Sequence, residues 1–165
     1  MVAQIPQLRC YAHSLTREPE RAQDLVQDCL QRAFEKLHLW KQGTNMRAWL
    51  FTIMHNIHAN AAKRFNTGPQ FVSMEQTEHL NNHEPVLDHK DDALIMQDLE
   101  AALRLLSSEH REIIYLVCIE ELKYNQVASI LDLPLGTVMS RLYRAREQLR
   151  QHLYGDSKNN VRRLL

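Results

Sequence analysis

Apolar residues recur at steps of three and four along most of the chain, which is the spacing of an α-helix with one buried face. In the first half this pattern predicts helices over Gln7–Leu15, Pro19–Leu39 and Met46–Phe65. Pro19 suits the first turn of a helix, where its missing N–H costs nothing, and Asn45 suits an N-cap. The buried faces of the second and third helices should comprise Ala22, Leu25, Val26, Cys29, Ala33, Phe34, Leu37, Leu50, Ile53, Met54, Ile57 and Ala61.

The second half shows the same spacing and predicts four more helices. The first begins near Lys90, and either Ser107 or Ser108 caps the second. The apolar stripe of the first comprises Ile95, Leu99, Ala102, Leu103 and Leu106. The other three are expected over Glu109–Glu121, over Tyr124–Leu131, and from the turn at Asp132–Pro134 to about Tyr154.

The segment from Asn66 to His89 has no helical spacing and contains Gly68, Pro69 and Pro85, which is typical of a linker. We therefore predict an all-α fold with two small helical domains joined by a flexible linker. The predicted boundaries are 1–66 for the first domain, 67–89 for the acidic linker, 90–154 for the second domain and 155–165 for a tail.

The last two predicted helices form a candidate helix-turn-helix, in a winged-helix-like domain, whose second helix would lie in a DNA major groove. Its inward stripe would be Val138, Leu142, Leu149 and Leu153, with Ala145 beside it. Its outward face would carry hydroxyl groups and arginines, which bind phosphates and base edges. The pattern alone also fits a helical hairpin with a solvated arginine face. The outward residues are Thr137, Met139, Ser140, Arg141, Tyr143, Arg144 and Arg146.

The formal net charge is zero, but the charges are segregated along the chain. No acidic residue lies between Glu35 and Glu75, and Lys90 is the only base from Ser73 to Glu100. Bases again outnumber acids after Leu135. Two basic segments thus flank an acidic one, and such segments attract partners more than the total charge does.

The composition and motifs exclude several classes of protein. Three cysteines without a C-x-x-C spacing indicate reduced, buried thiols and a cytoplasmic location. We see no signal peptide and no apolar stretch long enough to span a membrane. No phosphate-binding glycine loop or catalytic constellation is present, so we expect neither an enzyme nor a cofactor.

The linker histidines His79, His83 and His89 could in principle bind zinc or nickel together with neighbouring carboxylates. Their spacing is loose and no cysteine ligand is near. The sequence therefore favours an acidic linker that avoids DNA, and we predict no metal site.

Four segments, in order along the chain, resemble the bacterial sigma-70 family of RNA polymerase sigma factors, in its extracytoplasmic-function (ECF) group. Leu133–Leu149 is similar to the promoter-reading helix, and Leu106–Ile114 to the helix that opens the same domain. Ala22–Phe34 and Met46–Asn56 resemble the polymerase-binding and promoter-melting helices. The resemblance covers about residues 8–65 and 93–153, which is most of the chain.

The resemblance implies a transcription-initiation factor that binds core RNA polymerase, duplex promoter DNA and the melted non-template strand, and that an anti-sigma factor holds inactive. The polymerase-binding set would be Asp24, Gln27, Asp28, Gln31 and Arg32. The proximal set, for the melted promoter element, would be Trp40, Asn45, Arg47, His55, Asn56, Asn60, Lys63 and Arg64. The distal set, for the duplex element, would be the outward residues of the last helix. Relatives often carry a base where this chain has Met139, so we expect a different distal preference.

Three rival functions remain open at this level. One is a metal-sensing interaction protein that would use His79, His83 and His89. A sigma-like decoy would bind an anti-sigma factor without reading DNA, although the arginine face of the last helix argues against it. A stand-alone helix-turn-helix regulator would bind its DNA tightly without polymerase.

Overall fold

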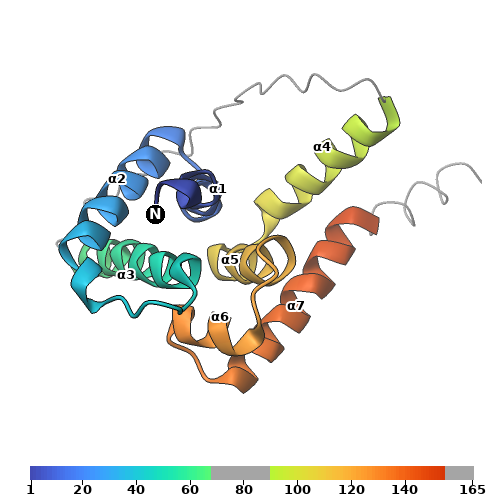
Figure 1. Ribbon diagram of the computed structural model, residues 1–165. Helices are drawn as coiled ribbons and strands as arrows, with labels where there is room; N and C mark the ends of the chain where they lie inside the picture. The colour runs from blue at the N-terminus through green and yellow to red at the C-terminus, as the bar shows by residue number, and fades with distance from the viewer. Residues whose placement is uncertain (68–89, 155–165) are drawn as a thin grey trace, which may run out of the picture.

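Every regular element in the described part of the chain, residues 1–67 and 90–154 of a computed structural model, is helical (Figure 1). The predicted tail and residues 68–89 of the predicted linker, with His79, His83 and His89, lie outside these residues, whereas Thr67 ends α3. The elements are η1 (Val2–Gln4), α1 (Ile5–Thr16), α2 (Pro19–Glu35), η2 (Leu37–Leu39), α3 (Met46–Thr67), α4 (Lys90–Leu105), α5 (Ser108–Ile114), the π-helical turn η3 (Tyr115–Ile119), α6 (Tyr124–Leu131) and α7 (Leu135–Tyr154).

Helices α1, α2 and α3 pack together as the N-terminal half. Tyr11 of α1 and Phe51 of α3 are fully buried at its centre, with ring centroids 4.6 Å apart. Pro19 lies in the first turn of α2, as predicted. Asn45 caps α3, because its Oδ1 accepts a hydrogen bond of 3.2 Å from the Ala48 N–H.

Helices α4 to α7 form the C-terminal half. Ser107 is the N-cap of α5, where its hydroxyl accepts a hydrogen bond from the His110 N–H. Asp132 ends α6 in the left-handed conformation, with φ of 51°, and the chain turns there into α7. The predicted inward stripe of α7 is confirmed at Val138, Leu142 and Ala145, which are buried. Leu149 and Leu153 are half-buried.

The two halves share one apolar core, in which α5 packs against α1 and α6 packs against α3 (Figure 1). The rings of Tyr11 and Tyr115 stack across the boundary with centroids 5.5 Å apart. The second half is therefore held on the first by direct packing as well as by the chain that joins them.

Several predictions at helix ends are wrong. The second helix ends at Glu35 instead of Leu39, and Leu37 lies in the short η2 turn, outside the helical period. Phe34, in the last turn of α2, is 64% exposed and Leu37 is 40% exposed. Similarly, α5 is followed by the wider turn η3, in which the Glu120 N–H bonds to the Tyr115 carbonyl, instead of continuing as one α-helix to Glu121.

Three other core or thiol predictions also fail. Ile95 is 63% exposed because the N-terminal end of α4 extends beyond the body of the protein (Figure 1). Ala61 is exposed, since the buried face of α3 ends near the half-buried Ile57. Cys10 and Cys118 are exposed, whereas Cys29 is buried as expected.

Candidate nucleic-acid interface

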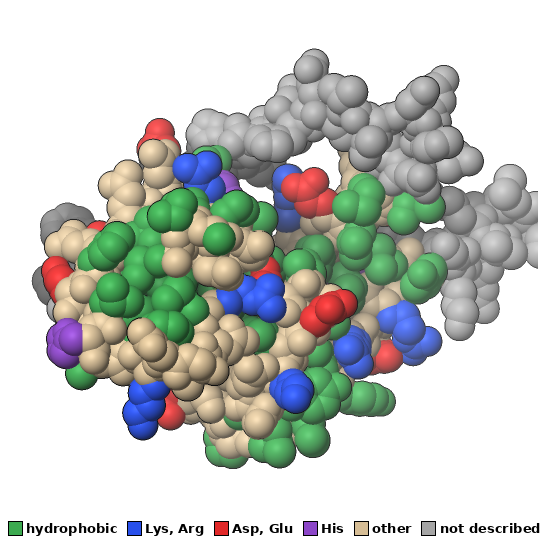
Figure 2. Space-filling model, in the orientation of Figure 1, with side chains coloured by type: hydrophobic (Ala, Val, Ile, Leu, Met, Phe, Trp, Pro, Cys, Tyr) green, Lys and Arg blue, Asp and Glu red, His purple; other side chains and the backbone are tan. Residues whose placement is uncertain are grey.

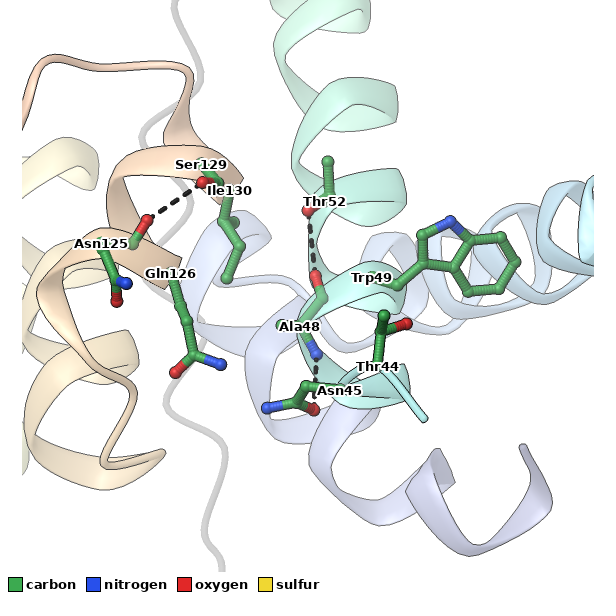
Figure 3. Close-up of a pocket in the computed structure, with 9 residues that line it drawn as sticks. All are labelled: Thr44, Asn45, Ala48, Trp49, Thr52, Asn125, Gln126, Ser129 and Ile130. Atoms are coloured by element: carbon green, nitrogen blue, oxygen red, sulfur yellow. Dashed lines mark hydrogen bonds between the residues drawn. The ribbon is translucent and has the colours of Figure 1, made fainter. Parts of the chain in front are cut away.

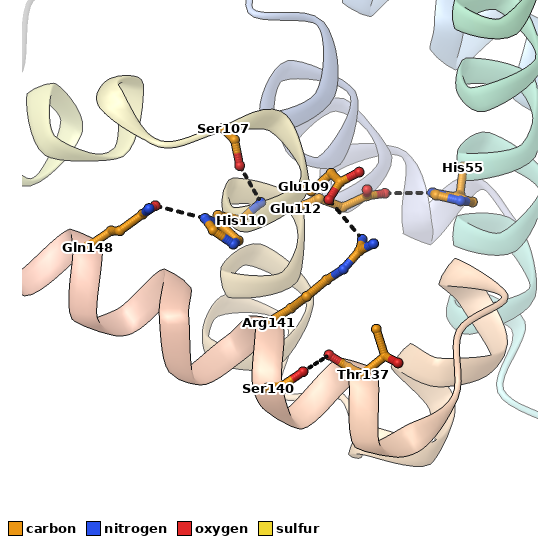
Figure 4. A network of polar contacts seen from close by, with 9 residues as sticks. All are labelled: His55, Ser107, Glu109, His110, Glu112, Thr137, Ser140, Arg141 and Gln148. Carbon is orange, nitrogen blue, oxygen red and sulfur yellow. Dashed lines mark hydrogen bonds and ion pairs between the residues drawn. The ribbon is translucent and has the colours of Figure 1, made fainter.

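The outward face of α7 carries the distal set. Ser140, Arg144 and Arg146 are exposed, Tyr143 is 73% exposed and Met139 is 48% exposed. Thr137 is half-buried in the first turn, where its carbonyl accepts a hydrogen bond of 3.1 Å from the Ser140 hydroxyl (Figure 4). A face with hydroxyls at the N-terminal end and arginines along its length has the chemistry to contact base edges and phosphates.

Two arginines of this face already have partners within the C-terminal half. Arg141 forms an ion pair of 3.1 Å with Glu109 of α5 (Figure 4). Arg146 donates a long hydrogen bond of 3.6 Å to the sulfur of Cys118. The Arg141–Glu109 pair is at the surface, where ion pairs are weak and easily exchanged for another anion, and Arg146 is exposed with one long bond to a thiol. Arg144 therefore stands out as an exposed cation at the centre of the face.

The proximal set lies on α3 and on the loop before it, but its members differ in exposure. Asn56, Asn60 and Lys63 are exposed along α3. Trp40 is half-buried, and its buried indole N–H has no hydrogen-bond partner among the residues that the structure describes. Asn45 is exposed, although its side-chain oxygen caps α3. The side chain of Arg64 lies outside the described residues.

Arg47 and His55 of the proximal set contact carboxylates of the C-terminal half. Arg47 Nη1 lies 3.0 Å from Oε2 of Glu120, a side chain that is 5% exposed. His55 Nδ1 lies 2.8 Å from Oε1 of Glu112 on α5 (Figure 4). The structure thus brings two candidate DNA-binding groups against carboxylates of the other half.

The same carboxylates hold two buried tyrosines. The Tyr11 hydroxyl donates to Glu112, and the Tyr115 hydroxyl donates to Glu120 over 2.8 Å. Burial raises the pKa of Tyr11 well above its ordinary value, and the neighbouring Glu112 raises this pKa further. Burial likewise raises the pKa of Tyr115, as does its hydrogen bond to Glu120. Both phenols therefore stay protonated as donors at any physiological pH.

Two further basic side chains, Arg111 and His58, line this boundary. Burial lowers the pKa of Arg111 to about 10, with a further lowering from nearby Arg17, so its guanidinium remains charged at neutral pH. Burial lowers the pKa of His58, although the charge of Glu112 opposes that shift. This lowering of the pKa favours the neutral form of His58.

An open hollow of about 340 Å³ lies between α3 and α6 (Figure 3). Its α3 side carries Asn45 and Trp49, and its α6 side carries Asn125 and Gln126. Trp49 lines the hollow and is half-buried, so its ring is neither fully in the core nor fully open to stacking. Most lining groups are neutral amides and hydroxyls, which differ from the charged groups of the neighbouring boundary.

The polymerase-binding set lies together on α2 and every member is exposed. It contains Asp24 and Asp28, so the face is partly acidic and suits a partner that carries basic side chains. Phe34 is exposed at the end of the same helix, and Figure 2 shows hydrophobic side chains gathered over this region. Helical periodicity placed Phe34 in the core and so missed this exposed aromatic.

Sequence reasoning also missed Glu112 and Glu120. Both read as ordinary surface acids, because glutamate is rarely buried without a partner. The sequence gave a partial indication of their burial, because both acids adjoin apolar residues. Glu112 precedes Ile113, and Glu120 follows Ile119. The identity of their partners on α1 and α3 could not be read from the sequence.

Comparison with known proteins adds an independent observation. A family model described as "Sigma2 domain of PhyR" matches residues 1–55, and one described as "Sigma-70, region 4" matches residues 96–149. The second match includes α5, α6 and most of α7, and hence the distal set. No helix of the described residues is long and apolar enough to cross a membrane.

Individual relatives agree with both family models. The chain is 32% identical over 156 residues to the ECF RNA polymerase sigma factor EcfG of Rhodopseudomonas palustris, covering 94% of this chain and 84% of the relative. Among solved structures it is similar to the sigma factor RpoE in complex with the anti-sigma factor NepR from Bartonella quintana, with a TM-score of 0.76, 34% identity and 92% of each chain covered. A structure of CnrH with the cytosolic domain of CnrY shares the fold, with a TM-score of 0.63 at 24% identity.

Proposed function

Since the chain belongs to the ECF RNA polymerase sigma factors, we propose that it binds core RNA polymerase and directs promoter-specific transcription initiation. The observation that carries the proposal is the outward face of α7. Its leucines pack inward, while Ser140, Tyr143 and Arg144 are presented to solvent on a rigid helix. A helix of this kind can enter a major groove and contact base edges.

The proposal assigns each surface the role that the resemblance to sigma factors implies. The distal set on α7 binds the duplex element, and the proximal set around α3 binds the melted non-template strand. Extracting a base from the DNA stack costs a few kcal/mol. Contacts with the base in a protein pocket recover about 1–3 kcal/mol per base and so offset this cost. The exposed, partly acidic face of α2 binds the polymerase.

The polymerase supplies the chemistry in this proposal, and the chain acts as a non-enzymatic specificity factor in the cytoplasm. Each DNA surface is small, so each binds weakly by itself. Attachment to one polymerase makes the two contacts effectively intramolecular and raises the overall affinity. We also propose that an anti-sigma factor binds the chain, as NepR binds the similar sigma factor RpoE.

The test is transcription in vitro with purified core polymerase and a library of genomic fragments, with start sites mapped by sequencing. We expect transcripts from a defined set of promoters that depend on the added chain. A decoy would give no promoter-specific transcript. A stand-alone regulator would instead shift duplex DNA tightly in the absence of polymerase.

A further inference from the structure

We propose that Glu109 on α5 determines the base specificity of α7: it holds the Arg141 guanidinium in an ion pair, so that Arg141 discriminates between bases instead of binding any nearby phosphate. The inference deepens the proposed function and rests on it, because it treats α7 as a helix that lies in a DNA major groove. Glu109 acts through Arg141 and is therefore a positioning residue.

Arg141 leaves α7 at the edge of its buried stripe. It directly precedes the buried Leu142, and its own side chain is 31% exposed. The guanidinium lies toward α5, where Nη1 is 3.1 Å from Oε2 of Glu109 (Figure 4). In the described part of the chain, neither Arg144 nor Arg146 pairs with a carboxylate. Arg141 thus differs from the other arginines of the distal set in being held by an acid of another helix.

Glu109 is well placed to hold this side chain, because its helix is anchored. The Ser107 hydroxyl caps the start of α5, one turn from buried side chains. Those side chains are Arg111, which donates to the Ser14 carbonyl at 2.6 Å, and Glu112, which accepts the Tyr11 hydroxyl. The backbone that carries Glu109 therefore has a defined position relative to the core.

A second polar contact fixes the rotation of α7 against α5. Nδ1 of His110, the residue after Glu109, lies 2.8 Å from Oε1 of Gln148 (Figure 4). Gln148 follows Arg141 by roughly two helical turns, so both lie on the same face of α7. Two consecutive residues of α5 thus contact α7 at two points along its length, and this arrangement directs the Arg141 side chain.

The ion pair leaves part of the guanidinium available. A guanidinium carries its N–H donors in a rigid planar fork. Among the residues that the structure describes, Nη1 of Arg141 pairs with Glu109, and neither Nε nor Nη2 forms a hydrogen bond. An arginine edge with two free donors can bind O6 and N7 of a guanine together. Glu109 can therefore orient Arg141 without occupying that edge.

The benefit of the pair is orientation of Arg141, since an exposed ion pair adds little to the stability of the fold. A free arginine side chain has many rotamers and loses that freedom when it contacts one base. A guanidinium held by Glu109 has lost part of it before DNA arrives. The pair also becomes stronger when DNA excludes water from this face, because the local dielectric constant falls.

Glu109 should have the opposite effect on binding that is independent of sequence. Its carboxylate is 63% exposed and carries the same charge as the DNA backbone. It therefore repels nearby phosphates and keeps the charge of Arg141 partly neutralised. A residue with a purely structural role would strengthen the binding of all sequences alike. Glu109 should instead lower the affinity for any duplex and raise the preference for one base.

The test compares the full-length wild type with E109Q, which removes the charge and keeps the side-chain size. A pool of random-sequence DNA duplexes is selected at low ionic strength on the chain alone and on the chain bound to core polymerase, and sequencing gives the preference at each base pair. We expect E109Q to reduce the preference at the base pair that Arg141 contacts by roughly fivefold or more, the size of a bidentate base contact. Its affinity for a fluorescent duplex of random sequence, without polymerase, should equal or exceed that of the wild type.

Further variants show whether Glu109 acts through Arg141. R141A should lose the preference at the same base pair, and E109Q added to R141A should change it no further. E109D keeps the charge but shortens the side chain by one methylene, so it should lose the preference without a gain in affinity for random sequence. The matched control is E147Q, because Glu147 pairs with Arg150 on α7 away from Arg141. E147Q should keep the wild-type preference, and circular dichroism checks the helices of every variant.

The proposal is overturned if E109Q keeps the wild-type preference, because Arg141 would then exchange Glu109 for a phosphate on DNA. It is also overturned if E109Q weakens the binding of all sequences alike, or if the wild type selects no preferred sequence in either form. The selection on the chain alone does not depend on transcription. The proposed function fails separately, if the wild type with core polymerase yields no promoter-specific transcript.

Discussion

Substitution of Arg144 on α7 is the most direct test of the DNA-binding proposal. Arg141 is partly engaged by Glu109 and Arg146 bonds to Cys118, whereas Arg144 is exposed and has no ion pair within 4 Å in the described part of the chain. An arginine that forks onto a guanine edge or a phosphate loses all of that contact on truncation. Its effect is therefore the cleanest of the three arginines to interpret.

We expect Arg144→Ala to weaken transcription from the chain's own promoters by about 1–3 kcal/mol, or roughly five- to 150-fold. Transcript yield with core polymerase, at limiting concentrations of the chain, measures the change. Arg150→Ala is the matched control, because Arg150 is exposed on the same helix and pairs with Glu147 outside the distal set. Equal losses in both variants would remove Arg144 from the DNA contacts.

A second prediction at this scale concerns the thiols. Burial raises the pKa of Cys29 to about 12, so at pH 8 only roughly one molecule in ten thousand carries the reactive thiolate. Cys10 and Cys118 are exposed. A thiol reagent should therefore label two cysteines quickly in the native protein and the third only in denaturant. Rapid labelling of Cys29, identified by mass spectrometry, would contradict the buried position, and Cys118→Ser should remove one fast site.

At the scale of the helices, the sequence predicted what local chemistry controls. Asn45 and Pro19 start their helices as expected, and α6 has the predicted bounds. The errors arise where tertiary packing decides, as at Phe34 and Ile95. An apolar residue with the right period is buried only if another element covers that turn of the helix, and the period carries no information about coverage.

The cap of α5 gives a test at this scale, because the sequence left Ser107 and Ser108 as alternatives. The structure assigns the cap to Ser107, whose hydroxyl accepts the His110 N–H at 3.3 Å. Ser107→Ala should lower the free energy of unfolding by about 1 kcal/mol in urea denaturation, since the first turn loses an acceptor. Ser108→Ala should have almost no effect. A larger loss for Ser108→Ala would mean that the helix begins one residue later.

At the scale of the whole molecule, the contact between the halves is the feature that the sequence could not supply. The segments that meet are separated by about one hundred positions, as with Tyr11 and Glu112, and no local pattern specifies their pairing. The family resemblance predicted two domains and a set of DNA-binding residues. The roles of those residues stay predictions, and the boundary shows that Arg47 and His55 have protein partners as well.

Because the two halves share one core, we expect the molecule to unfold as a unit. Both tryptophans, Trp40 and Trp49, belong to the N-terminal half, so their fluorescence reports on that half, whereas circular dichroism reports on helices of both. Because Tyr11 and Tyr115 stack across the boundary inside one shared core, loss of one half exposes apolar surface of the other. We therefore expect the two signals to change at the same urea concentration, in one cooperative transition. In E112Q/E120Q the weakened boundary should let the two curves move apart. Separate curves in the wild type would show that the halves are stable without each other, and the packing between them would then contribute little to the stability of the protein.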